Sequence, residues 1–268
     1  IPGCIDSLAT NYDSEANTND GSCYGYPDNG DYSLSFDGVD DYVEINNSSN
    51  LLENNFHTIE VWLKQDELDS QTQDIVSKDG EGFDRQWLLE IQPNRHIQSA
   101  IWQDNDYSMT TTESNLINID DLYHIVQLWD GNQLKIFVNG NEMASTQADN
   151  NLAEGDEPVR IAGGASQGYN PLHFSGTIYE VKLWDRDLSI DEINQSYQNI
   201  DIDDIGLIVD YRFNSGSGNT LYDHSGNGNH GTINGATWQY DIELHSGANL
   251  ISFMSLPEDN TVGNVLSP

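Results

Sequence analysis

Short apolar runs alternate with polar turns through most of the chain, from residue 33 to residue 184. Within many runs, hydrophobic and polar side chains alternate and β-branched and aromatic residues are frequent, which is typical of strands with one buried face. Asp130-Gly131 and Asn139-Gly140 separate neighbouring runs and predict tight hairpin turns. The expected strands are 33–36, 42–45, 58–63, 74–77, 87–91, 96–102, 123–129, 134–138, 159–161 and 177–184.

One segment interrupts the strands with the pattern of a short helix. Ser189 is followed three residues later by Glu192, which forms a capping box, and Ile193 and Tyr197 then give an apolar face. Residues 206–238 return to strands and turns. Many short strands with one short helix predict an all-β fold, a two-sheet antiparallel sandwich.

Cys4 and Cys23 bound a polar segment with too few apolar residues to form a core alone. We expect them to form a disulfide in an oxidising compartment, where closing this loop stabilises by roughly 3 kcal/mol. A solvated disulfide loop is the interpretation we favour for the segment. The alternative is a hard-cation site, since five side chains are spaced like oxygen ligands. These are Asp6, Asn11, Asp13, Asn19 and Asp20.

The pattern divides the chain into three parts. Residues 1–27 are expected to form a disulfide-closed linker repeat, residues 31–239 the main domain, and residues 240–268 the first strands of a following module. Because the sequence begins and ends abruptly, we expect it to be a piece of a longer secreted or cell-surface protein, in contact with neighbouring domains.

The charge is strongly acidic, with 9 Lys and Arg against 45 Asp and Glu and a formal net charge of -36. Nucleic acids and anionic membrane surfaces are therefore excluded as partners, because both require basic patches. No apolar stretch is long enough to cross a membrane. The charge favours a salty or calcium-containing medium, and a solvated acidic surface explains it equally well.

Four segments resemble laminin-G-like, concanavalin-A-like jelly rolls of secreted bacterial proteins. They are SFDGVDDYV at 35–43, FHTIEVW at 56–62, the hairpin within 123–140, and FSGTIYEVKLW with its continuation at 174–193. The resemblance implies a jelly-roll sandwich over 33–238. Tyr179 and Tyr123 depart from it, since the family often has Asp and Trp there. Residues 1–27 resemble short Cys-bounded repeats between domains of large secreted proteins.

The segment 211–231 also resembles this family, although in many members it precedes the FDG motif. It either completes the same sandwich as a permuted strand or opens a second copy. We favour the first interpretation, because no second FDG strand follows Trp238.

The Gly- and Asn-rich loop 223–231 is the best candidate calcium site, because flexible loops with carboxylate and carbonyl oxygens suit a hard cation. Asx-turns alone are the alternative explanation of this loop. A second acidic group, Asp37, Asp40 and Asp41, is interpreted mainly as a tight turn. The resemblance implies that Asp37 or Glu180 lies close to the loop. The predicted calcium ligands are Asp223, Ser225, Asn229, His230, Asp37 and Glu180.

Catalysis finds little support, because the paired carboxylates of a glycosidase strand are not visible in the sequence. Most tryptophans fall in strand patterns and are expected in the core. Trp102, Tyr107 and Asp104 are the residues expected to contact a glycan. The sequence thus predicts a non-enzymatic, calcium-binding, lectin-like extracellular adhesion module for a glycan or protein ligand. A spacer in a surface fibre is the alternative, and a glycoside hydrolase the weakest one.

Overall fold

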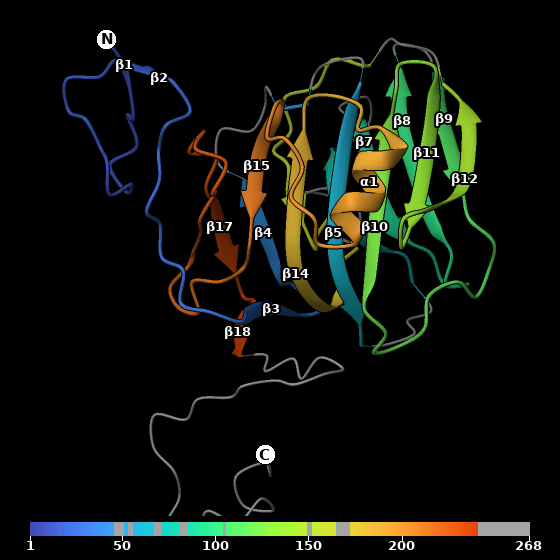
Figure 1. Ribbon diagram of the computed structural model, residues 1–268. Coiled ribbons are helices and arrows are strands. Elements are labelled where there is room, and N and C mark those ends of the chain that lie inside the picture. Colours follow the sequence, from blue (N-terminus) through green and yellow to red (C-terminus); the bar gives the residue numbers. More distant parts are fainter. Residues whose placement is uncertain are drawn as a thin grey trace, which may run out of the picture.

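The computed structural model describes residues 1–45, 51–52, 56–66, 71–80, 85–103, 106–148, 152–164 and 172–240. Two antiparallel sheets of eight strands each pack face to face as a sandwich (Figure 1). The predicted all-β, jelly-roll type of fold is confirmed.

Sheet I has the strand order β12-β11-β10-β5-β14-β3-β18, and β15 pairs with β14 beside β3. Its strands are β3 (Tyr32–Asp37), β5 (His57–Gln65), β10 (Tyr123–Trp129), β11 (Gln133–Val138), β12 (Asn141–Gln147), β14 (Ser175–Trp184), β15 (Leu207–Tyr211) and β18 (Thr237–Tyr240).

Sheet II has the strand order β16-β17-β4-β13-β6-β7-β8-β9. Its strands are β4 (Tyr42–Ile45), β6 (Gln73–Asp79), β7 (Arg85–Ile91), β8 (Ile97–Gln103), β9 (Asp106–Thr111), β13 (Arg160–Ile161), β16 (Thr220–Leu221) and β17 (Gly231–Asn234).

The main core lies between the two sheets and is built by alternation along each strand. On β7, Trp87, Leu89 and Ile91 point into this core, so Leu88 and Glu90 between them face the outside of sheet II. The large buried residues include Trp129 and Phe36 from sheet I. This alternation decides which polar side chains of each strand are available on the outer faces.

Helix α1 (Ile190–Tyr197) covers the outer face of sheet I (Figure 1). The predicted capping box is confirmed, since the Ser189 side chain accepts from the Glu192 backbone N–H and the Glu192 side chain accepts from the Ser189 N–H. Ile193 packs into a second, smaller core with residues from sheet I. Sheet I is therefore buried on both faces along β10 and β14.

Residues 207–240 lie in the same two sheets as the rest of the domain. β15 pairs with β14 and β18 with β3 in sheet I, while β17 pairs with β4 in sheet II. The segment thus adds strands to both layers and builds no second copy.

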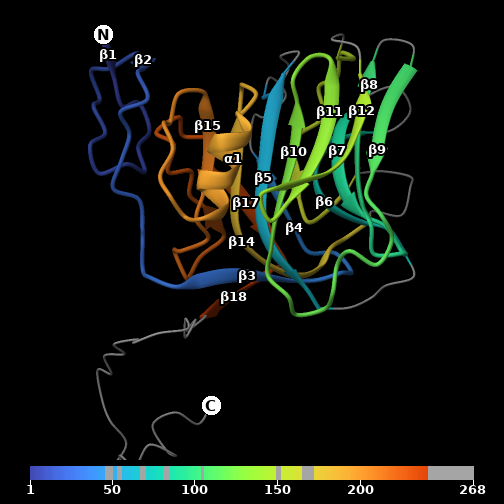
Figure 2. The same cartoon turned by 45° about the vertical axis from the view of Figure 1, so that its right-hand side comes forward.

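The amino-terminal segment stands beside the sandwich, next to the loops around β15 and β17 (Figure 2). It holds two short strands, β1 (Pro2–Gly3) and β2 (Thr18–Asn19), and the predicted disulfide between Cys4 and Cys23 is confirmed. The strands expected after residue 240 lie outside the described residues.

Within the sandwich, the strands β9 and β12 are missing from the sequence prediction. Each lies at the edge of its sheet and is mostly exposed to solvent. Edge strands carry polar residues on both faces, so they lack the alternation on which the prediction depends. β9 begins at Asp106.

Candidate functional site

An aromatic pair lies on the outer face of sheet II. Trp102 of β8 is paired in register with Tyr107 of β9, and their rings stack with centroids 6.3 Å apart and planes 28° apart. Tyr107 is 56% exposed, and the Arg85 guanidinium lies over the Trp102 ring at 4.3 Å from its centroid. We call Trp102 and Tyr107 the aromatic platform. Large flat side chains presented to solvent in this way offer a rigid contact surface.

Alternation along β8 places Trp102 on this outer face. Ile97 and Ile101 point into the main core, so Trp102 beside Ile101 must point outward. The prediction that Trp102 and Tyr107 lie together is consistent with the structure, whereas Asp104 lies outside the described residues.

Polar side chains surround the platform on neighbouring strands. Arg85 forms an ion pair with Asp79 and donates two hydrogen bonds to its carboxylate. Farther along β7, Glu90 accepts hydrogen bonds from the amide groups of Gln92 and Gln98. The Arg85–Asp79 pair therefore places a fixed donor and acceptor beside the platform, the arrangement that orients a polar ligand.

A buried pair of carboxyl groups, Asp74 and Glu90, lies on the same face and is not evident from the sequence. The two residues are opposite each other on β6 and β7, and both are nearly inaccessible to solvent. Burial raises the pKa of both, and for Asp74 the charges of Glu90 and Asp79 raise it further. The raised pKa of Asp74 favours its neutral form, whose hydroxyl can donate to the Glu90 carboxylate.

This carboxyl pair does not have the geometry of a glycosidase. A retaining enzyme needs its two carboxyl groups about 5–5.5 Å apart and an inverting one about 6.5–9.5 Å. A direct hydrogen bond holds Asp74 and Glu90 much closer than either spacing. Their burial also keeps a substrate away from them.

The predicted calcium ligand Asp223 is fully buried and organises its own loop. Its carboxylate accepts hydrogen bonds from the backbone N–H groups of Asp210, Ser225 and Asn229 and from the Ser225 hydroxyl, each at 2.9 Å. These four donors occupy the positions that a cation would need. The Asp223 carboxylate is therefore held by the protein's own donors, and its role as a calcium ligand stays a prediction.

The rest of this loop faces the amino-terminal segment. His230 accepts the Asp223 N–H at Nδ1, and its Nε2 lies 2.7 Å from the Asp6 carboxylate, which also accepts from Tyr26 at 2.6 Å. The carbonyl oxygens of Gly226 and Asn227 accept from the Asn19 amide. The loop and the disulfide segment are thus packed together through polar contacts.

Asn19 and Asp6, which the sequence suggested as possible cation ligands, have these structural roles instead. Gly226 also explains one glycine of the loop: it has a φ of 88°, and a Cβ there would lie 2.2 Å from the Gly21 carbonyl oxygen. Only glycine allows this close approach.

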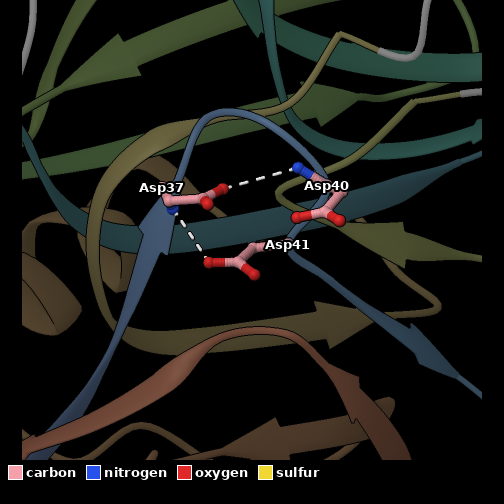
Figure 3. Close-up of side chains that lie close together, drawn as sticks. All are labelled: Asp37, Asp40 and Asp41. Carbon is pink, nitrogen blue, oxygen red and sulfur yellow. Dashed lines mark hydrogen bonds between the residues drawn. The ribbon is translucent and has the colours of Figure 1, made fainter.

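Asp37 and Glu180 lie elsewhere and do not join Asp223 in any close group of ligands among the described residues. Asp37 ends β3 and belongs to an acidic turn with Asp40 and Asp41 (Figure 3). Glu180 lies on the outer face of β14, in an ion pair with Lys182 at 2.8 Å. The structure therefore separates the six predicted ligands into three places.

The acidic turn is where the described residues bring three carboxylates together, with one oxygen of each within 4.8 Å of the others. Asp41 accepts the Asp37 N–H, and Asp37 accepts the N–H groups of Val39 and Asp40. Burial, Asp37 and Asp40 raise the pKa of Asp41. These bonds are those of the predicted tight turn, and calcium binding remains a prediction.

The model of the concanavalin A-like lectin/glucanase superfamily matches residues 37–194. The chain belongs to this superfamily. Among curated proteins, none matches the chain. The matched residues run from the end of β3 into helix α1, so they include the aromatic platform and most of both sheets.

Solved structures of superfamily type share this fold at low identity. A candidate carbohydrate-binding protein of Bacteroides ovatus has a TM-score of 0.62 and 17% identity, over 85% of this chain and 66% of that one. A heptameric pentraxin of Limulus polyphemus has a TM-score of 0.50 and 16% identity, over 62% and 82% of the chains. The CBM40 module of a Ruminococcus gnavus sialidase, bound to α2,3-sialyllactose, has a TM-score of 0.50 and 15% identity, over 62% and 97%.

These similarities show the lectin-type fold of this superfamily member, and the sialyllactose belongs to the Ruminococcus gnavus module alone. In the described part of the chain, no helix has the length and apolar character needed to span a membrane.

Proposed function

We propose that this chain is a non-catalytic glycan-binding module that holds a sugar against the aromatic platform on sheet II. The observation that carries the proposal is the stacked pair of Trp102 and Tyr107 on the outer face of sheet II, in which Tyr107 is exposed and Trp102 is half-buried. The C–H face of a pyranose ring packs on flat aromatic rings, and its hydroxyl groups require fixed polar partners. The Arg85–Asp79 pair next to Trp102 supplies such partners.

The preferred glycan is neutral. Arg85, the cation at the platform, is already paired with Asp79, and the whole chain has a formal net charge of -36. The negative charge of the chain would repel an acidic sugar, and the platform's own cation is not free to bind it.

An extracellular setting and an adhesive role complete the proposal. The disulfide between Cys4 and Cys23 is a bond that persists in oxidising compartments. Calcium remains part of the proposal only as a general stabiliser of an acidic protein, because the platform contains no predicted calcium ligand.

A structural spacer is the second candidate, and the packing of the disulfide segment favours it. The contacts of Asp6 with His230 and Tyr26, and of Asn19 with the loop 223–231, hold this segment firmly against the sandwich. A fixed angle between consecutive modules is what a stalk requires.

The test is a glycan array that includes neutral and acidic cell-wall and marine polysaccharides, probed with the purified chain. We expect saturable binding to a neutral glycan and no release of sugar during prolonged incubation. Absence of binding to all glycans would leave the spacer as the function. Release of reducing sugar by the pure chain would contradict the non-catalytic assignment.

A further inference from the structure

A cavity of about 550 Å³ lies on the opposite side of the molecule from the aromatic platform. Its floor is the outer face of β14 and β15, and the end of α1 and residues 199–204 form its wall. This volume is within the range of small-molecule sites, about 300–1,000 Å³. No part of the proposed glycan site contributes to it.

The acidic side chains of this cavity outnumber the basic ones. Glu180, Asp201, Asp204 and Asp210 line it together with two cations, Lys182 and Arg212. Both cations form ion pairs with acidic residues of the cavity: Lys182 with Glu180 at 2.8 Å and Arg212 with Asp210 at 2.7 Å.

Asp201 and Asp204 are exposed at the rim and have no basic partner among the described side chains. The cavity therefore presents an excess of negative charge, which attracts a cation and repels an anion.

Asp210 provides a second observation that points to a ligand. This residue is only 2% exposed, and its Oδ1 has no hydrogen-bond donor among the described residues, while Oδ2 accepts twice from Arg212. A buried acceptor without a donor is costly, so such an atom usually has an additional partner. An ammonium or guanidinium group brings only donors and a positive charge.

The remaining wall of the cavity is apolar. Trp184, Ile202 and Leu207 line it beside the charged groups. A short aliphatic chain can pack there while its charged end faces Asp210 and the rim. Burial alone would lower the pKa of Lys182, but Glu180, Asp210 and Glu60 raise it, so its positive charge remains on the floor and confines a second cation to the acidic side.

From these observations, we propose that the cavity beneath helix α1 binds a small organic cation with a short aliphatic chain, of the diamine or guanidinoalkyl class. The site is independent of the glycan proposal, because it lies on sheet I and uses none of the same residues.

The test is isothermal titration of the whole chain with putrescine, and with butane-1,4-diol and succinate as neutral and anionic molecules of similar length. We expect one saturable putrescine site and affinities at least about tenfold weaker for the other two, since charge-assisted bonds are lost. Trp102→Ala should bind putrescine as the wild type does.

Two matched double variants separate this site from general attraction of cations to an acidic protein. Asp201→Asn/Asp204→Asn removes the exposed rim charges, whereas Asp31→Asn/Asp156→Asn removes two exposed charges that do not line the cavity. We expect the first to weaken putrescine binding about fivefold or more and the second to have little effect. Equal effects, multiple weak sites, or equal binding of butane-1,4-diol would overturn the proposal.

Discussion

The outer faces of the two sheets both carry aromatic residues, but helix α1 covers those of sheet I, whereas Tyr107 on the edge strand of sheet II is exposed. On sheet I, Trp62 stacks with Tyr197 of α1 at 6.0 Å between ring centroids, and Trp184 is buried in the second core. On sheet II, Trp102 and Tyr107 stack on each other and face solvent. The same alternation thus yields core on one face and a platform on the other.

The two faces also bury acidic groups differently. On sheet I, Glu60 accepts from the Trp184 indole at 2.8 Å and contacts His124 at 3.3 Å. Burial alone would raise the pKa of Glu60, but His124 and Ser196 hold it below its usual range, so it stays charged. On sheet II, burial instead raises the pKa of Asp74 and Glu90 and so favours their neutral forms. A buried carboxyl group is therefore stabilised either in its charged form, by hydrogen-bond donors, or in its neutral form, by protonation.

The largest expected effect is on the face that α1 covers. Glu60→Ala removes the partner of two buried polar groups, so the free energy of unfolding should fall by about 3–5 kcal/mol. Glu60→Gln keeps an acceptor for the Trp184 indole and should lose less. Urea denaturation of both variants measures the difference. If Glu60→Ala is as stable as the wild type, the contacts with His124 and Trp184 contribute little to the free energy of unfolding.

A slightly smaller effect is expected at Asp223, which bridges to Tyr211 of sheet I and follows β16 of sheet II. Asp223→Ala leaves several buried N–H groups without an acceptor and should lower the free energy of unfolding by about 3 kcal/mol. The loss should be the same in calcium and in excess EGTA, because we assign these bonds to the protein itself. Thermal unfolding in both media measures it.

A calcium-dependent result would change this account of Asp223. Calcium at a hundredfold excess over Kd stabilises a folded state by about 2.7 kcal/mol. If the wild type shows such a gain and Asp223→Ala alone loses it, Asp223 is a calcium ligand after all. If Asp40→Asn loses it instead, the ion binds at the acidic turn.

The effect expected for Asp74 is the smallest and depends on pH. Because its pKa is raised in the folded state, the folded chain binds more protons than the unfolded one above the ordinary Asp pKa of about 3.9. This contribution to stability is full below that value and is lost as pH rises through the raised pKa.

Asp74→Asn keeps a donor for Glu90 at every pH, so it should be about 1 kcal/mol more stable than the wild type at pH 8 and similar at pH 4. Asp31→Asn, which removes an exposed charge, is the matched control and should show no such pH dependence. Urea midpoints at several pH values test this. A loss of stability in Asp74→Asn at all pH values would contradict a neutral Asp74 that donates to Glu90.

The sequence predicts the two-sheet fold because alternation, hairpin turns and the capping box at Ser189 are local signals. It misses β9 and β12, whose exposed edges remove the alternation. The Asp74–Glu90 pair depends on the register between β6 and β7, which no local pattern reveals. The contacts of the loop 223–231 with residues more than 200 positions earlier in the chain are likewise invisible to local patterns.

The most direct test of the central claim is the affinity of three proteins for the neutral glycan selected on the array: wild type, Trp102→Ala and Tyr24→Ala. Tyr24 is exposed like Tyr107 but lies in the amino-terminal segment, away from sheet II. Isothermal titration should show a loss of about 10- to 100-fold for Trp102→Ala, as expected for an aromatic contact, and no change for Tyr24→Ala. Unchanged affinity of a folded Trp102→Ala protein would contradict the assignment of the aromatic platform as the glycan site.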